Sequence, residues 1–149
     1  MHNEAAISLS KYRIEQAREF LHDAEHNLEV NAYKTANNRA YYSIFHSMRA
    51  LLALDGVDFK KHSGVIAYFR EKYIKTKIFE RKYSDIVSSA SLIRNKSDYD
   101  DFYIANKQET VEQVENARSM YEVVEEYLRN IFRHINSDSN SDSNGDKNR

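Results

Sequence analysis

Four residues near the end of one predicted helix combine types that could bind and process a phosphate. Arg94, Asn95, Asp98 and Tyr99 lie together in the segment RNKSDYDDFY. At about 100° per residue, Arg94 falls near the centre of the apolar arc formed by residues 83–93. A buried guanidinium costs free energy unless it is paired or meets an anion. The pattern predicts either an internal Arg94–Asp98 ion pair or a site in which these four residues are catalytic.

A second set of polar residues lies on one face of the helix expected over residues 33–54. Arg39, Tyr42, His46 and Arg49 follow an i, i+3, i+7, i+10 spacing and form one stripe. Two guanidiniums, an imidazole and a phenol can hold phosphate and stack on a base, so these residues are candidates for binding RNA or a nucleotide. The alternative is contact with neighbouring helices or a partner subunit, and for His46 we favour this structural role.

His62 opens the segment HSG at an expected helix start and is a further candidate binding residue. No metal site is expected, because the six histidines form no HExxH pattern and His22 and His26, one turn apart, have no evident third ligand. The chain has no cysteine, no glycine-rich phosphate loop and no GxSxG elbow. We therefore expect no metal and no cofactor.

Charge is unevenly distributed although the whole chain carries a net charge of −1. Residues 60–82 hold eight Lys or Arg and two Glu, whereas residues 107–128 hold six Glu and two basic residues. Aromatic residues are interleaved with the basic ones, a combination that could follow a phosphate backbone. The alternative is a solvated helix face that binds no polyanion.

The elements that must position these residues are helices. The 149 residues include no proline and only three glycines, which excludes folds built from many short strands and turns. Apolar residues recur at helical spacing, and the pattern predicts an all-α, antiparallel bundle of about five helices. The expected helices cover about 5–30, 33–54, 62–74, 80–97 and 107–134.

The chain reads as one domain followed by a tail. Residues 1–136 form the expected bundle, and residues 137–149 contain no apolar side chain and are rich in Ser, Asn and Asp, which predicts disorder. No apolar run approaches the length of a membrane span, and the N-terminus lacks the plan of a signal peptide. We expect a cytoplasmic protein that does not contact a membrane.

Three segments in order resemble the HEPN superfamily of small helical bundles, in particular its short stand-alone prokaryotic branch. They are NRAYYSIFHSMRALLALDG at 38–56, KHSGVIAYFREKYIKT at 61–76 and RNKSDYDDF at 94–102. The resemblance covers almost the whole expected bundle. It implies an antiparallel bundle that forms a homodimer, with Arg94 at the dimer cleft.

The resemblance also implies chemistry. Many HEPN proteins are metal-independent ribonucleases, and many are toxins paired with a minimal nucleotidyltransferase antitoxin. Active members carry an Arg and a His that are separated by four to six residues. Arg94 and Asn95 match the start of that motif, but positions 99, 100 and 101 hold Tyr, Asp and Asp.

The missing histidine matters because imidazole transfers protons near pH 7, whereas phenol has an unperturbed pKa of about 10. Arg94 can still hold a phosphate, Asp98 could act as a base with a raised pKa, and Tyr99 could position substrate or accept a modification. His46 or His62 could supply the imidazole from another helix.

Two functions remain open. The first is a toxin-like HEPN subunit of a toxin–antitoxin or defence pair that binds RNA or a nucleotide in a dimer cleft, with metal-independent ribonuclease activity if it is an enzyme. The second is a non-catalytic helical adaptor that docks a minimal nucleotidyltransferase and positions its substrate.

Overall fold

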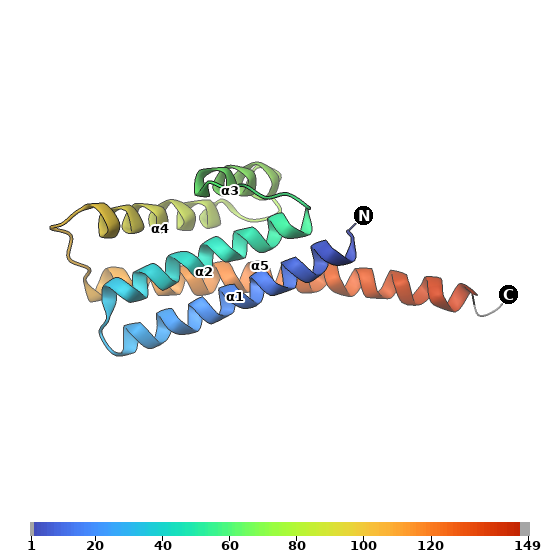
Figure 1. Cartoon of the computed structure of the whole chain (residues 1–149), viewed down its shortest axis with the longest axis horizontal. Coiled ribbons are helices and arrows are strands. Elements are labelled where there is room, and N and C mark those ends of the chain that lie inside the picture. Colours follow the sequence, from blue (N-terminus) through green and yellow to red (C-terminus); the bar gives the residue numbers. More distant parts are fainter. Residues whose placement is uncertain (1, 147–149) are drawn as a thin grey trace.

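The structure, a computed structural model that describes residues 2–146, is an all-helical bundle (Figure 1). No β-strand occurs within these residues, which confirms the predicted fold class. Each predicted helix is present, and most boundaries agree within two residues. The elements are α1 (Glu4–Glu29), α2 (Tyr33–Leu54), α3 (His62–Phe69), the π-helical η1 (Arg70–Ile74), α4 (Arg81–Tyr99) and α5 (Lys107–Asp146).

Helix α2 is the centre of the bundle and contacts α1, α3, α4 and α5. It is the most apolar of the long helices, and its buried side chains include Ile44, Met48, Leu51 and Leu52. Small residues let α1 approach closely. The Ser10 hydroxyl donates to the Ala50 carbonyl at 2.8 Å, and the Ser43 hydroxyl donates to the Ala17 carbonyl at 2.8 Å. These bonds fix the α1–α2 pair against which the site residues are placed.

The end of α2 is set by Gly56, which adopts a positive φ of 73°. The Gly56 N–H bonds the Ala53 carbonyl at 3.1 Å and the Val57 N–H bonds the Leu52 carbonyl at 3.0 Å. This is a Schellman motif, in which a left-handed residue that is usually glycine satisfies the last carbonyls of a helix. The turn sends the chain back across α2 towards His62.

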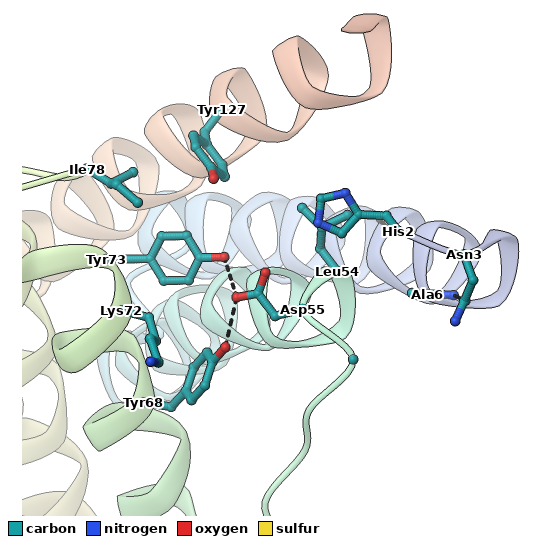
Figure 2. A pocket seen from close by; sticks show the side chains of 11 residues that line it. His2, Asn3, Ala6, Leu54, Asp55, Tyr68, Lys72, Tyr73, Ile78 and Tyr127 are labelled. Atoms are coloured by element: carbon teal, nitrogen blue, oxygen red, sulfur yellow. Dashed lines mark hydrogen bonds between the residues drawn. The ribbon is translucent and has the colours of Figure 1, made fainter. Parts of the chain in front are cut away.

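One difference from the sequence-based prediction is the widened turn η1 after α3. The Lys75 N–H bonds the Arg70 carbonyl at 2.9 Å, five residues back. This wider turn brings Tyr68 and Tyr73 to the same side, and both phenols donate to Asp55 Oδ2, at 3.0 and 2.6 Å (Figure 2). The periodicity of residues 62–74 predicts one continuous α-helix and does not reveal this change.

Helix α5 extends well beyond the other helices (Figure 1). It continues as helix through residues 137–146, most of the segment for which composition predicts disorder; residues 147–149 lie outside the described part of the chain. The division into a bundle and a disordered tail stays a prediction. No helix within residues 2–146 is long and apolar enough to cross a membrane.

Candidate functional site

Arg94 lies where α4 passes α2 and the start of α3. Its Nη1 is 2.7 Å from His62 Nδ1 and 3.3 Å from the Tyr41 hydroxyl. The guanidinium carbon lies 4.7 Å from the centre of the Tyr41 ring and 5.7 Å from that of Tyr42. Its Nε is 3.5 Å from Asp98 Oδ2, so the ion pair considered from the sequence is present. Arg94 is therefore held by an imidazole and a phenol as well as by a carboxylate.

His62 is held as a neutral imidazole. Its ring stacks on Phe45 with the ring centres 4.0 Å apart, and its Nδ1 is 2.8 Å from the Tyr41 hydroxyl. Because arginine can only donate, Nδ1 must accept from Arg94, which places the ring proton on Nε2. Burial, with the positive charges of Arg94 and Arg49, lowers the pKa of His62 below 6.5. A neutral imidazole is the form that can accept a proton.

The loop before α3 positions His62 through a close backbone approach. A Cβ added at Gly64 would lie 2.9 Å from Phe59 Cβ and 3.0 Å from its ring. Such a distance is too short for two carbon atoms, so only glycine lets Phe59 pack against the first turn of α3. The glycine of the HSG segment thus fixes where the helix, and with it His62, begins.

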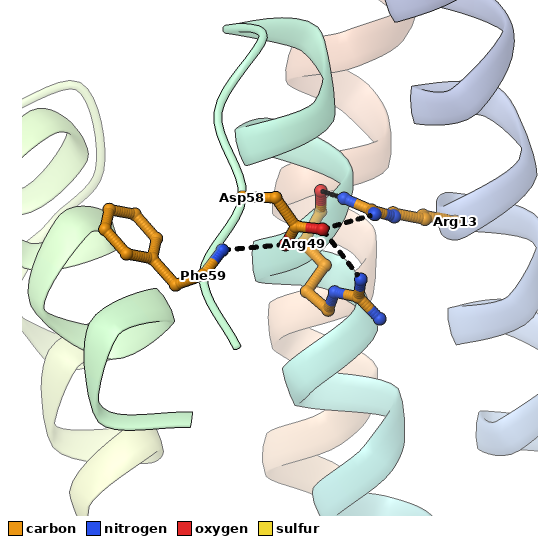
Figure 3. A network of polar contacts seen from close by, with 4 residues as sticks. All are labelled: Arg13, Arg49, Asp58 and Phe59. Atoms are coloured by element: carbon orange, nitrogen blue, oxygen red, sulfur yellow. Dashed lines mark hydrogen bonds and ion pairs between the residues drawn. The ribbon is translucent and has the colours of Figure 1, made fainter. Parts of the chain in front are cut away.

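An ionic network holds the same loop from the other side (Figure 3). Asp58 Oδ2 accepts from Arg13 and from Arg49, each at 3.3 Å, and Oδ1 accepts from the Phe59 N–H at 2.9 Å. Arg13 is almost fully buried and also donates to the Arg49 carbonyl at 3.2 Å. Arg49, predicted as a binding residue, therefore lies at the site and helps to anchor the loop.

A cavity of about 480 Å³ lies beside this network and opens next to His62. Its walls combine two phenylalanine rings with cationic side chains. Phe59 is partly exposed, so its ring is available to stack on a planar group. This combination suits a nucleotide, whose base stacks and whose phosphate pairs with cations. The lining residues are Phe45, Arg49, Asp58, Phe59, Lys60 and His62.

The predicted stripe on α2 is divided between two environments. His46 turns towards α1, where its ring stacks on Phe20 with the centres 5.2 Å apart, and the Arg39 guanidinium lies over the same Phe20 ring at 5.6 Å. Burial, helped by the charges of Arg49 and Arg13, lowers the pKa of His46 to about 4. Tyr42 is the residue of this stripe whose ring lies against the Arg94 guanidinium. The geometry agrees with the structural role favoured for His46.

The rest of the predicted catalytic cluster is exposed to solvent. Asn95 faces a groove between α3 and α4, and 82% of the Tyr99 surface is accessible. Phe102 and Ile104, in the loop that follows, are 93% and 84% exposed. Of the four predicted catalytic residues, the structure thus brings Arg94 and Asp98 into contact with each other. The other two, Asn95 and Tyr99, are exposed.

Tyr41 is the site residue that sequence reasoning does not single out. Its position on the apolar face of α2 marks it as core, and its ring is indeed buried. Burial raises the pKa of its phenol, against the opposing effect of Arg94, so the hydroxyl stays protonated. The only available signal is that tyrosine carries a polar atom that needs a partner when buried.

A further cavity, of about 570 Å³, lies between the ends of α1 and α2 and the middle of α5 (Figure 2). Its lining includes none of the predicted site residues. Asp55 lies in its wall and joins the end of α2 to α3 through Tyr68 and to η1 through Tyr73. Within residues 2–146, no group of three or more His, Cys, Asp or Glu side chains could hold a metal ion.

The family sequence model of the HEPN domain matches residues 10–127, which include every residue of the Arg94 site. The chain belongs to the HEPN family. This HEPN chain is 28% identical over 123 residues to a "UPF0332 protein" of Thermotoga maritima, covering 83% of this chain and 93% of that protein. It is 40% identical over 86 residues to a Methanocaldococcus jannaschii protein named "Putative toxin MJ0605", covering 58% of this chain and 64% of that protein.

Solved structures share the HEPN fold. TT1696 from Thermus thermophilus superposes with a TM-score of 0.66 at 20% identity and covers 78% of this chain and 96% of its own. ST0689, described as an archaeal HEPN homologue, superposes with a TM-score of 0.58 at 17% identity, and the match covers 80% of this chain and 97% of ST0689. At these identities the likeness concerns the fold alone.

Proposed function

We propose that this HEPN chain is a toxin-like subunit that binds RNA at Arg94 and cleaves it with His62 as the base, without a metal. The observation that carries the proposal is the 2.7 Å contact between Arg94 Nη1 and His62 Nδ1. The family motif lacks its histidine here, and α3 places an imidazole beside the same arginine. The relatives named as toxins support the toxin-like role.

Substrate binding follows from the charges around the pair. A phosphodiester next to Arg94 gains a charge-assisted hydrogen bond, and Arg49 and Lys60 in the neighbouring cavity add positive charge. Phe59 offers an exposed ring on which an unpaired base can stack. Single-stranded RNA is thus the substrate class that the cavity fits.

The chemistry uses the existing contact. A phosphate competes with Nδ1 for the Arg94 N–H groups, and when the guanidinium turns to the phosphate and the Tyr41 hydroxyl donates to the same phosphate in place of Nδ1, Nδ1 becomes free to accept the 2′-hydroxyl proton. The 2′ oxygen forms a bond to phosphorus and the bond to the 5′ oxygen breaks. The leaving oxygen takes a proton from water, and the imidazolium later returns its proton to solvent. The products are a 2′,3′-cyclic phosphate and a 5′-hydroxyl.

The proposal also includes a dimer and a partner. The family resemblance points to a homodimer with Arg94 at its cleft and to a minimal nucleotidyltransferase as antitoxin. The exposed Tyr99, Phe102 and Ile104 support this part, because large apolar side chains that are exposed within one short segment are a feature of interaction sites. An interface at this surface would adjoin Asp98 and the Arg94 site.

The test is RNA cleavage in the presence of EDTA, comparing the wild-type protein with Arg94→Ala, His62→Ala and the control His22→Ala, which removes an exposed imidazole on α1. We expect His62→Ala to lower the rate at least about 100-fold, as is typical for loss of a general base, Arg94→Ala to lower it through loss of the charge-assisted phosphate contact, and His22→Ala to leave it unchanged. The rate should fall as the pH drops through the pKa of His62, below 6.5. A wild-type protein that neither cleaves nor retains RNA at low salt would refute the proposal.

The adaptor function remains a second candidate, favoured by two observations. The motif histidine is absent at positions 99–101, which hold Tyr, Asp and Asp, and the side chains of Tyr99 and Phe102 are exposed. An adaptor would bind the nucleotidyltransferase through Tyr99 and Phe102. Loss of partner binding in Arg94→Ala, with RNA binding intact, would favour the adaptor over the ribonuclease.

A further inference from the structure

A groove between α3 and α4 adjoins the proposed catalytic pair on both helices. Ser63 follows His62, Asn95 follows Arg94, and both line this groove, whose volume is about 480 Å³. Its polar lining residues are Ser63, Arg70, Ser88, Ser91 and Asn95. Among the described residues that line it none is acidic, so Arg70 carries the only formal charge in this lining.

Arg70 is held in place without being neutralised. Its Nε donates to the Ser84 hydroxyl at 2.9 Å, and its Nη2 donates to the Ser84 carbonyl at 3.4 Å and to the Ser88 hydroxyl at 2.7 Å. All three acceptors are uncharged. Within residues 2–146, Nη1 has no hydrogen-bond partner and no carboxylate oxygen lies within 4.0 Å of the guanidinium. The orientation of the side chain is therefore fixed while its charge is left unpaired.

The arginines around the catalytic pair differ from Arg70 in this respect. Arg13 and Arg49 share the Asp58 carboxylate, and Arg94 lies 3.5 Å from Asp98. An oriented, unpaired guanidinium in a groove without acidic residues favours an anion there, because the anion is bound without displacing a carboxylate.

The remaining groups of the groove are donors that suit phosphate oxygens. The Ser91 hydroxyl is shielded from solvent and has no hydrogen-bond partner in the described part of the chain, so a rotation about its Cα–Cβ bond that turns it to a ligand in the groove breaks no existing hydrogen bond. The Ser88 hydroxyl accepts from Arg70 and so keeps its own hydrogen free to donate. The Asn95 amide adds further donors at the end nearest Arg94.

We propose that this groove is a phosphate subsite for single-stranded RNA, where Arg70 and the two serines hold the backbone next to the phosphodiester at Arg94. The inference rests on the proposed function and adds that the protein prefers a polynucleotide to a dinucleotide, because only a longer strand reaches both places. Arg70 is a binding residue in this account and takes no part in proton transfer.

The test measures binding of fluorescently labelled single-stranded oligoribonucleotides that are 2′-O-methylated, and so lack the hydroxyl that the proposed cleavage needs, at several salt concentrations, with an eight-nucleotide strand and a dinucleotide. The variants are Arg70→Gln, which keeps an amide to bond the serines, Ser91→Ala, and Arg94→Ala. The control is Arg18→Gln, which replaces an exposed arginine paired with Glu15 on α1. We expect Arg70→Gln to weaken octanucleotide binding about 5–10-fold and to reduce the slope of log K against log salt by about 0.7, one phosphate contact. Arg70→Gln should bind the dinucleotide as the wild type does. Arg18→Gln should match the wild type in both octanucleotide affinity and salt slope.

The outcomes separate this inference from the function on which it rests. If Arg94→Ala weakens binding but Arg70→Gln and Ser91→Ala leave octanucleotide affinity and salt slope unchanged, the groove is not a subsite and the proposed function stands. Equal weakening of both RNAs by Arg70→Gln, with a lowered melting temperature, would show a structural role and overturn the inference. If the wild-type protein binds neither RNA, the proposed function fails and the subsite fails with it.

Discussion

Acidification should destabilise the fold through His46, and a substitution at His46 should distinguish its contribution to the pH dependence of stability from that of His62. His46 is packed between α1 and α2, stacked on Phe20, and burial together with nearby arginines lowers its pKa from 6.5 to about 4. Between these two pH values the unfolded chain binds a proton at His46 and the folded chain does not. The free energy of unfolding therefore rises with pH in this window. The contribution is complete above about pH 6.5 and is lost as the pH falls towards 4.

The size of this effect follows from the shift. One pKa unit corresponds to about 1.36 kcal/mol, so the full shift sets an upper limit of about 3 kcal/mol. The imidazole is only partly buried, and solvent screens part of the repulsion from Arg49 and Arg13. We therefore expect His46 to contribute about 1–2 kcal/mol across the window.

The assay is urea unfolding at pH 7.5 and pH 5 for the wild type, for His46→Phe, which keeps a ring against Phe20, and for the control His22→Ala. Between the two pH values, the wild type and His22→Ala should each lose about 1 kcal/mol more than His46→Phe. Some loss should remain in His46→Phe, because the pKa of His62 is also lowered. Equal losses in the wild type and His46→Phe would refute the conclusion that the folded chain holds His46 as a neutral ring.

Three further substitutions test the elements that support the site. Gly64→Ala should cost about 1 kcal/mol in thermal unfolding, since overpacking against Phe59 outweighs the gain in helix propensity; an unchanged or raised midpoint would contradict the close approach. Asp58→Asn should lower the free energy of unfolding in urea by about 1–3 kcal/mol, because it leaves the charge of the buried Arg13 without a carboxylate. A decrease below about 0.5 kcal/mol would show that the network is dispensable for stability. Truncation after Asn136 should change the unfolding free energy by less than about 0.5 kcal/mol, as the removed segment has no apolar side chain to bury; a larger loss would show that the tail is part of the fold.

The helices are the part of the fold that sequence patterns predict well. Apolar spacing places α2 at its observed residues, and the Asp55–Gly56 pair predicts its end, because glycine tolerates the positive φ that the turn requires. The π-helical turn at 70–74 is not predictable in this way. It depends on two tyrosines meeting Asp55, a contact between segments that helical periodicity does not contain.

The site is predicted in part, for a similar reason. Arg94 stands out because a charge interrupts an apolar arc of its own helix, which is a local signal. Its partner His62 lies 32 residues away, and only the tertiary arrangement shows that it, and not His46, meets the guanidinium. Both histidines occupy plausible positions in sequence, and the rotation of α2 turns His46 towards α1. The role of Tyr41 is not predicted, because the apolar spacing marks its ring as part of the core and gives no sign that its hydroxyl contacts Arg94 and His62.

The most direct test of the central claim is chemical rescue of His62→Ala by free imidazole, with RNA cleavage measured in EDTA. If His62 supplies the base beside Arg94, cleavage should fall at least about 100-fold and return partly as imidazole is added, with the rescued rate rising with pH as the added imidazole loses its proton. Arg94→Ala should show no rescue. If His62→Ala cleaves RNA at the wild-type rate without imidazole, the assignment of His62 as the base is contradicted.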